Sequence, residues 1–388
     1  MASNNSIEKS LSGWKISIPI VLGLSIAIWM IYSSVNQTTY ISLDKGKGNY
    51  SWIDANKNGV VDIHNSKEFV LSDNGDYALE TVSSVIKSID FGAHVWIWLA
   101  VAVLFMVGRD FFYMVRIRVL TKSELSWKRS FNVILLWEFA SALTPGVVGG
   151  AAIAMFILNR ERIALGRSTA IVVITAFLDN FFYILMIPVV FLIIDQDILF
   201  PENISSSASV QFIFWTGFAT IFIVCSFLFA SIFIFPTLAK TVLGFIFRFP
   251  LLKRWRKKAM QTGEEIYTTS GELKGEPFSF WVKAFLSTCG SWVSRYLVIN
   301  AILQAFIQLS ITEHFVLLGK QLVLWLFMLV SPTPGASGVA EYAFGELLSP
   351  FATSSMLLIA MAVIWRLISY FPYLFIGALL LPRWLRKR

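Results

Sequence analysis

Long apolar runs separated by short polar segments make up most of this chain. A helix rises about 1.5 Å per residue, so roughly 20 apolar residues cross a hydrocarbon core about 30 Å thick. The first run is longer than the apolar core of a signal peptide and lacks a small-residue cleavage site, so we expect it to remain as a span. Six runs predict full transmembrane helices, at about 16–35, 91–108, 169–194, 210–235, 284–311 and 354–381.

Composition agrees with a membrane protein and argues against several other classes. Of the 388 residues, 56% are hydrophobic and 14% are charged, and the mean hydropathy is +0.68, whereas soluble globular chains carry about 25% charged residues. The net charge of +8 does not indicate a nucleic-acid partner, because Lys and Arg lie at the ends of apolar runs. The two cysteines lie inside apolar runs and the three histidines are far apart, so we expect neither a disulfide framework nor a zinc site.

The distribution of charge predicts the orientation of the chain. Residues 36–90 form the longest polar segment, with eight Asp or Glu against five Lys, and we expect this acidic segment outside the cell. Lys9 and Lys15 precede the first run, and the chain ends in RWLRKR. Since Lys and Arg are retained on the cytoplasmic side, we expect a multi-pass protein of the bacterial inner membrane with both termini in the cytoplasm. The basic residues after the second run are assigned to the same face: Arg109, Arg116, Arg118, Lys122, Lys128 and Arg129.

The apolar run at 131–158 is interrupted by TPGVVGG and is followed by three arginines within 160–167. One continuous helix would carry these arginines outside and would also reverse every later segment, including the basic segment 237–260. A chain that breaks at Pro145 and turns back keeps all of them inside. We therefore predict a re-entrant helical hairpin at 131–158 and a second one, entering from the opposite side, at 315–349.

Two similar boxes mark these breaks. Residues 143–151 read LTPGVVGGA and residues 332–340 read PTPGASGVA, so both contain TPGxxG, 189 positions apart. Interrupted segments at matching places of two oppositely oriented halves are typical of an inverted repeat around a transporter's central site. Lipid cannot satisfy the freed backbone groups, and the helix halves that follow the glycines aim free N–H groups at the membrane middle, which favours an anion. The candidate substrate-binding residues at the breaks are Thr144, Pro145, Gly146, Gly149, Gly150, Thr333, Pro334, Gly335 and Gly338.

A simpler interpretation of the boxes remains open. Pro and Gly can kink a helix without any binding role, and residues 146–150 fit a GxxxG packing face.

Five charged residues lie well inside apolar runs: Glu138, Asp179, Arg295, Glu341 and Arg366. A charge at the bilayer centre costs about 2.5 to 3.5 kcal/mol on insertion scales, so these side chains are expected to face one another or a hydrated cavity. Arginine suits phosphate because it donates two hydrogen bonds at once. Our functional interpretation is that Arg295 and Arg366 bind a lipid phosphate, while the three carboxylates set the geometry or carry a coupling proton. The alternative is a set of structural ion pairs.

The residues now described resemble a known family. FASALTPGVVGGAAIAMFILNRERIALGRSTAIVV and PTPGASGVAEYAF, followed by AVIWRLISYFPYLFIGALLLP, look like the flippase-like family typified by the transmembrane domain of lysylphosphatidylglycerol synthase. The resemblance covers most of 130–388 and implies a membrane protein that moves a lipid with a polar headgroup between leaflets. Two departures concern the boxes: Ala336 stands where the family usually has a second glycine, and the first box lacks a Glu after its glycines. No aminoacyl transferase domain follows Arg388 in this sequence, so the resemblance does not imply synthase activity, and we expect no enzyme.

The acidic segment contains a calcium-loop spacing. In DANKNGVVDIHN, Asp54, Asn56 and Asn58 occupy positions 1, 3 and 5, and Asp62 occupies position 9. Position 12, which should offer a bidentate carboxylate, is Asn65. The pattern predicts a weak calcium site, with an ordinary Asn/Gly turn as the alternative.

Together these features predict an all-α integral membrane protein with about six full transmembrane helices and two oppositely oriented hairpins in an inverted repeat. Its leading predicted function is lipid translocation, with membrane lipids carrying an anionic headgroup as partners. The alternatives are an ion-coupled transporter of a small anionic solute and a membrane-embedded transferase or hydrolase; against the latter, no nucleotide loop or nucleophile-and-base pattern is found. The expected parts are an N-terminal helix at 1–35, an extracytoplasmic loop at 36–90, a first membrane half at 91–236, a basic cytoplasmic linker at 237–280 and a second membrane half at 281–388.

Overall fold

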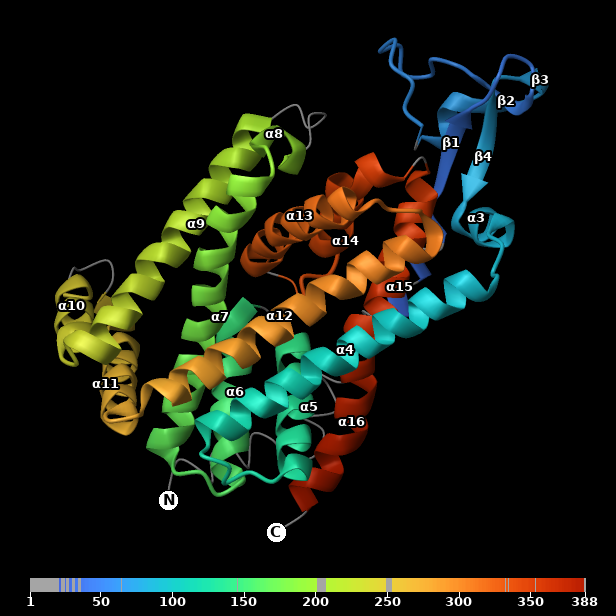
Figure 1. Cartoon of the computed structure of the whole chain (residues 1–388). Coiled ribbons are helices and arrows are strands. Elements are labelled where there is room, and N and C mark those ends of the chain that lie inside the picture. The colour runs from blue at the N-terminus through green and yellow to red at the C-terminus, as the bar shows by residue number, and fades with distance from the viewer. Residues whose placement is uncertain are drawn as a thin grey trace.

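The computed structural model describes residues 36–386 except 64, 145, 201–206, 249–252, 332, 334 and 353, together with residues 21, 25, 28, 29, 32 and 33. Helices dominate it (Figure 1), as expected for an all-α membrane protein. The predicted first span at 16–35 lies largely outside the described residues.

The bundle begins with α4 and ends with α16. Its helices are α4 (Ala93–Leu120), α5 (Trp127–Leu143), α6 (Gly146–Arg160), α7 (Leu165–Ile193), α8 (Gln196–Leu199), α9 (Ser207–Phe229), α10 (Leu238–Ile246), α11 (Arg256–Leu273), α12 (Phe278–Phe306), α13 (Ile311–Val330), α14 (Val339–Leu348), α15 (Ser355–Ser369) and α16 (Phe371–Arg386).

Five helical segments in the described part of the chain are long and apolar enough to cross a membrane: Ala93–Leu120, Leu165–Ile193, Gln211–Ile234, Ile311–Leu329 and Ser355–Arg386. The fourth corresponds to α13, which we had expected to form one arm of a hairpin. By contrast, α12 is not among the five, although a span was expected there. This helix carries buried polar side chains within the bundle, among them Thr288 and Asn300.

The acidic segment is more ordered than the expected loop. It forms an antiparallel sheet of β1 (Thr38–Ser42), β2 (Gly48–Trp52), β3 (Phe69–Gly75) and β4 (Tyr77–Thr81), in the order β1-β4-β2-β3. Its small core includes the stacked rings of Tyr40 and Phe69. After β4, α3 (Val82–Ser88) begins at a capping box made by Thr81 and Ser84. Val82 and Val85 of α3 then pack against Met356 and Ala360 of α15, which joins the sheet to the bundle.

We call the end of the bundle that carries this sheet the sheet end, and the opposite end, where the loops after α4 and α6 lie, the basic end (Figure 1). At the basic end, Arg129 at the start of α5 pairs with Glu161 after α6 at 2.6 Å, and Trp384 of α16 donates to the same carboxylate. The chain therefore runs along α5, breaks, and returns along α6 to the end where it started.

The pair of helices around the second break, α13 and α14, starts and ends at the other end of the bundle. The start of α13 bonds to the far end of α12 through His314 and Asn300, and the segment after α14 leads to Ser354, which bonds to Glu80 of β4 at 2.8 Å. Both ends of the α13–α14 pair thus lie at the sheet end. Re-entry of the two hairpins into a bilayer stays a prediction.

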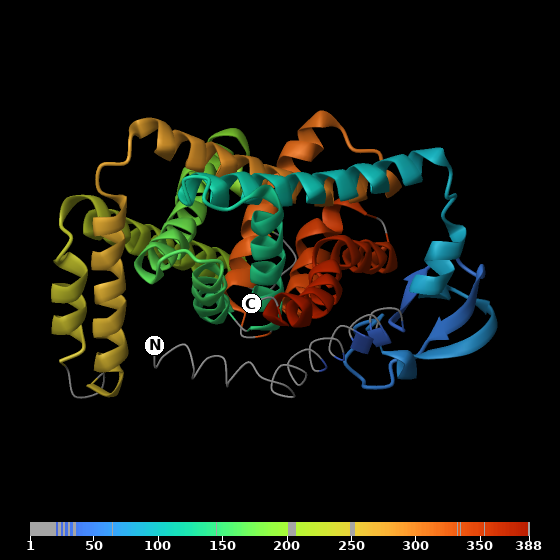
Figure 2. The same ribbon diagram turned by 90° about the horizontal axis from the view of Figure 1, so that it is seen from below.

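Close packing of α4 against α12 forms the longest helix contact in the bundle, and the two helices run side by side in both views (Figures 1 and 2). Gly290 of α12 makes this approach possible, because a Cβ there would lie 2.7 Å from the ring of Phe112. Figure 2 shows α10 and α11 on one side of the bundle and the sheet on the opposite side.

Candidate functional site

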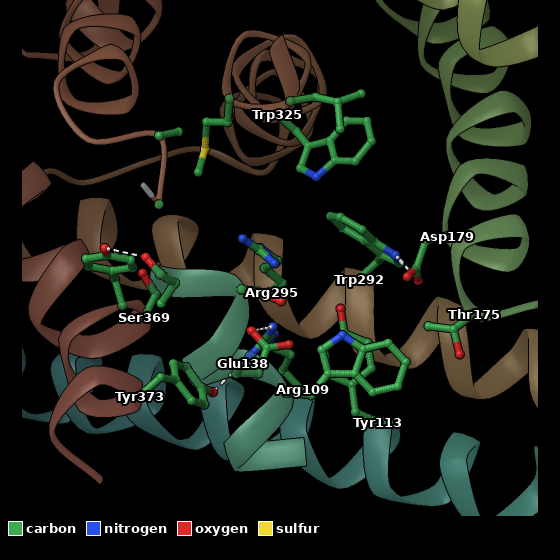
Figure 3. A pocket seen from close by; sticks show the side chains of 18 of the residues that line it. Arg109, Tyr113, Glu138, Thr175, Asp179, Trp292, Arg295, Trp325, Ser369 and Tyr373 are labelled. Carbon is green, nitrogen blue, oxygen red and sulfur yellow. Dashed lines mark hydrogen bonds and ion pairs between the residues drawn. The ribbon is translucent and has the colours of Figure 1, made fainter. Parts of the chain in front are cut away.

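A cavity of about 340 Å³ lies inside the bundle. Its wall is built from α4, α5, α6, α7, α12, α13, α15 and α16, and from both helix breaks, which contribute Thr144 on one side and Thr333, Gly335 and Ala336 on the other. Several aromatic residues and arginines are among the other lining residues (Figure 3). The two TPGxxG boxes, although far apart in sequence, therefore meet at one site.

The α4 wall carries an arginine that is almost completely buried. Arg109 is 2% exposed and donates to Glu138 of α5 at 2.7 Å and to Asp110 at 3.1 Å. It also donates to the Tyr373 hydroxyl at 2.9 Å, and that hydroxyl donates to Asp110 at 2.8 Å. A buried cation with two carboxylates and a phenol around it is neutralised and fixed in place.

Two turns further along α4, Arg116 makes a second ion pair. It donates to Asp179 of α7 at 2.6 Å and to the Thr288 hydroxyl of α12 at 3.2 Å. The Trp292 indole donates to the same Asp179 oxygen at 2.9 Å. Between the two arginines, the Tyr113 ring lies 4.6 Å from each guanidinium carbon, so a single face of α4 presents both charges.

The second break is held by a third pair. Arg366 of α15 is 3% exposed and donates to Glu341 of α14 at 2.5 Å and to the Gly335 carbonyl at 3.0 Å. Glu341 also accepts from the Gly338 N–H at 2.7 Å. Arg366 therefore ties the loop of the break to both helices that follow it, and its donors are engaged by the protein.

Tyr370 connects the two breaks. Its hydroxyl donates to the Ala142 carbonyl at 3.1 Å, beside the first break. Its ring packs on Gly335 in the second, where a Cβ would lie only 2.2 Å from the ring. The glycine is needed there for close approach and for its φ of +58°.

Arg295 differs from the other three arginines on the cavity wall. Arg109, Arg116 and Arg366 each have a carboxylate within 3.1 Å, but none lies within 4.0 Å of Arg295 among the described residues. The Trp292 ring lies 5.4 Å from its guanidinium carbon. In Figure 3 the Arg295 side chain points into the open space between Trp325 and Glu138.

The structure places most of the predicted site residues at or next to this cavity. Arg295, Arg366, Glu138, Asp179, Thr144, Thr333 and Gly335 line it. Glu341 and Gly338 lie behind Arg366, and Gly150 packs on Ser141 of α5. Gly146 and Gly149 lie in the first turns of α6, while Pro145 and Pro334 lie outside the described residues.

Two arginines were assigned wrongly from the sequence. Arg109 and Arg116 were placed on the cytoplasmic face, whereas α4 continues to Leu120 and buries both of them in the cavity wall. Their spacing of seven residues, with Tyr113 between them, was the available signal, because it puts all three on one helical face.

In the predicted calcium loop, the Asp54 carboxylate accepts hydrogen bonds from the backbone of the loop itself. Asp54 accepts from the N–H groups of Asn58 and Gly59 at 3.0 Å, and the Asn56 amide donates to Glu68 at 2.6 Å. Glu68, which lies three residues beyond position 12 and is fully buried, was not predicted from the sequence. Among the described residues no three His, Cys, Asp or Glu side chains converge as a metal site. Calcium binding through Asp54, Asn56, Asn58 and Asp62 stays a prediction.

Comparison with known proteins agrees with the resemblance drawn from the boxes. The family model for the lysylphosphatidylglycerol synthase TM region matches residues 75–377. A UPF0104 membrane protein of Archaeoglobus fulgidus is 26% identical over 327 residues, with 77% of this chain and 89% of that protein covered. No solved structure was found to match the chain. Since the family model spans most of the sequence, the predicted family is confirmed: this chain belongs to the family of the lysylphosphatidylglycerol synthase transmembrane region.

Proposed function

We propose that this protein is a lipid translocase that moves a phospholipid or a polyprenyl-phosphate-linked lipid between the leaflets of the bacterial inner membrane, with both termini in the cytoplasm. In this proposal the cavity receives the headgroup, and the protein catalyses no covalent reaction. Family membership supports one part of the proposal, namely that the protein is a membrane protein with this domain.

The observation that carries the proposal is that Arg295 has no carboxylate partner within the part of the chain that the structure describes. An arginine within the membrane is costly unless an anion accompanies it, and the three neighbouring arginines each have one from the protein. Arg295 faces an aromatic-lined cavity instead. A lipid phosphate is the anion that a membrane supplies, and the guanidinium can donate two hydrogen bonds to it.

Cavity size is consistent with a headgroup as the bound part. About 340 Å³ lies at the lower end of the range of small-molecule sites, roughly 300 to 1,000 Å³. A headgroup fits such a volume, while the acyl chains remain in lipid. Arg366 gives its part of the wall a fixed shape, because it is bonded to Glu341 behind it and to the carbonyl of Gly335 in the second break.

Replacing Arg295 by Gln tests the proposal. A hydrogen bond to a charged group contributes about 1.5 to 3 kcal/mol, so we expect Arg295→Gln to weaken binding of radiolabelled phosphatidylglycerol to the detergent-solubilised protein by about 10-fold or more. Exchange of fluorescent phosphatidylglycerol between leaflets of proteoliposomes should fall in parallel, and Arg295→Lys should retain part of both.

Arg383→Gln serves as the matched control, because Arg383 is exposed near the end of α16. If wild-type protein exchanges no lipid but transports a small anion into vesicles, the ion-coupled alternative replaces the proposal. Unchanged lipid binding by a folded Arg295→Gln variant would remove Arg295 from the site.

A further inference from the structure

A second, smaller pocket adjoins the cavity on the side of the sheet end. It measures about 20 Å³ and shares Arg295, Trp325, Met328 and Trp365 with the cavity. Its remaining wall comes from α12 and α13 and includes Tyr296 and Gln321. The cavity therefore has an extension that starts at Arg295.

One buried polar atom in this extension, the side-chain oxygen of Gln321, accepts no hydrogen bond from the described residues, and Gln321 is 2% exposed. Leaving such an atom unsatisfied costs about 1 to 3 kcal/mol. The Tyr296 hydroxyl, on a residue that is 7% exposed, also faces this space and interacts with the Tyr183 hydroxyl. A space of about 20 Å³ is enough for one water molecule, which needs 10 to 15 Å³ and two to four polar neighbours. The Arg295 guanidinium, the phenol and the amide oxygen supply those neighbours.

Hydrogen bonds connect Gln321 to the sheet end of the bundle through Asn300 and His314. The Gln321 amide donates to the Asn300 side-chain oxygen at 2.8 Å, and the Asn300 amide donates to the His314 carbonyl at 3.0 Å, close to the His314 ring. His314 lies in the first turn of α13, at the sheet end. We call these four residues, Arg295, Gln321, Asn300 and His314, the polar seam. Arg295 and Gln321 line the same small pocket, and hydrogen bonds join Gln321 to Asn300 and Asn300 to His314.

The polar seam covers about half of the distance across a hydrocarbon core. Trp325 at the cavity and His314 at the sheet end are 11 residues apart on α13, which corresponds to about 16 Å at 1.5 Å per residue. That is about half of a hydrocarbon core of about 30 Å. An apolar helix contact would pack as well without polar groups, because buried hydrogen bonds between membrane helices contribute only about 0.6 kcal/mol on average.

Resting on the proposed function, we propose that the polar seam between α12 and α13 is the path of the lipid headgroup between the cavity and the sheet end. Separation of α12 from α13 opens the seam, and Gln321 is its positioning residue. As the seam opens, the Gln321 amide exchanges its bond to Asn300 for one to a headgroup oxygen. Water fills the narrow part of the path in the closed arrangement.

Leaflet exchange in a Gln321→Met variant tests the path. Methionine has a similar volume and offers no hydrogen bond, so exchange of fluorescent phosphatidylglycerol in phosphatidylcholine proteoliposomes should fall at least fivefold. Binding of phosphatidylglycerol in detergent should remain at the wild-type level, because Arg295 is kept. Gln308→Met, at an exposed position just after α12, should exchange lipid like wild type. Wild-type exchange by a monodisperse Gln321→Met protein would overturn the proposal.

A thiol-reactivity measurement tests hydration of the seam without relying on lipid exchange. In a background with Cys225→Ala and Cys289→Ala, we expect Gln321→Cys to react with a charged, membrane-impermeant thiol reagent added from the sheet side. Leu322→Cys, at the same depth on another face of α13 and 3% exposed, should react at least tenfold more slowly. Equal rates at the two positions would show that the seam is dry and would overturn the path. If wild-type protein exchanges no lipid at all, the proposed function fails, and these rates alone decide whether the seam is an aqueous route.

Discussion

The two helix breaks carry the same TPGxxG box but are held in different ways. At the second break, Gly335, Ala336 and Gly338 all have positive φ, and Arg366 of α15 holds the loop by donating to the carbonyl of Gly335 and to Glu341. Within the described part of the first break, the bonds are neutral: Thr144 donates to the Ala140 carbonyl within its own helix, and Tyr370 donates to the Ala142 carbonyl.

This difference indicates separate roles for matching segments. A buried, charge-assisted clamp is strong and geometrically specific, whereas a neutral hydrogen bond contributes about 1 kcal/mol. We therefore expect the second break to be the fixed part of the cavity wall and the first break to be the part that moves. Four substitutions test this comparison.

The largest effect is expected from Arg366→Gln. It leaves the partly buried Glu341 carboxylate without its cation, and breaking a fully buried pair costs about 3 to 5 kcal/mol. Unfolding of the detergent-solubilised protein, followed by intrinsic fluorescence, should shift to a clearly lower denaturant concentration, while Arg383→Gln should leave the midpoint unchanged. A wild-type midpoint for Arg366→Gln would mean that the clamp does not hold the second break.

A pair of glycine substitutions should separate the two breaks. Gly335→Ala places a Cβ 2.2 Å from the Tyr370 ring at a φ of +58°, and overpacking of this kind typically costs about 1 to 3 kcal/mol. Gly150→Ala in α6 places its Cβ 2.5 Å from the Ser141 hydroxyl, which can rotate away, and 3.2 Å from the Ser141 Cα. We expect Gly335→Ala to lower the unfolding midpoint more than Gly150→Ala does; the reverse order would contradict the assignment of the second break as the fixed one.

The smallest effect is expected from Ala336→Gly, which restores the glycine usual in the family. Ala336 adopts a φ of +56°, and the left-handed region costs a residue with a Cβ about 1 to 2 kcal/mol. Glycine relieves this strain but gives part of the gain back as greater entropy of the unfolded chain. The unfolding midpoint should rise slightly. A lower midpoint would show that the Ala336 methyl group, which is buried, contributes more by packing than it costs by strain.

Much of the site could be predicted from the sequence, because a charged residue inside a membrane is costly unless it has a partner or a function. Glu138, Asp179, Arg295 and Arg366 stand out in apolar runs, and all four line the cavity. Arg109 and Arg116 were assigned to the cytoplasmic face because they follow an apolar run, where a basic residue ordinarily marks a membrane boundary. The sheet at 38–81 was not predicted, because its strands are short and separated by Asp, Asn and Gly.

By itself, the sequence determined that this chain is a membrane protein of its family and that the two boxes interrupt helices, since apolar length and the backbone limits of Pro and Gly are local properties. Only the tertiary structure decided which charges are neutralised. Arg116 and Asp179 are 63 residues apart, and Arg366 and Glu341 are 25 apart, so their pairing depends on how distant helices pack. The same packing leaves Arg295 without a carboxylate among the described residues, because the helices around it bring aromatic rings to its side of the cavity.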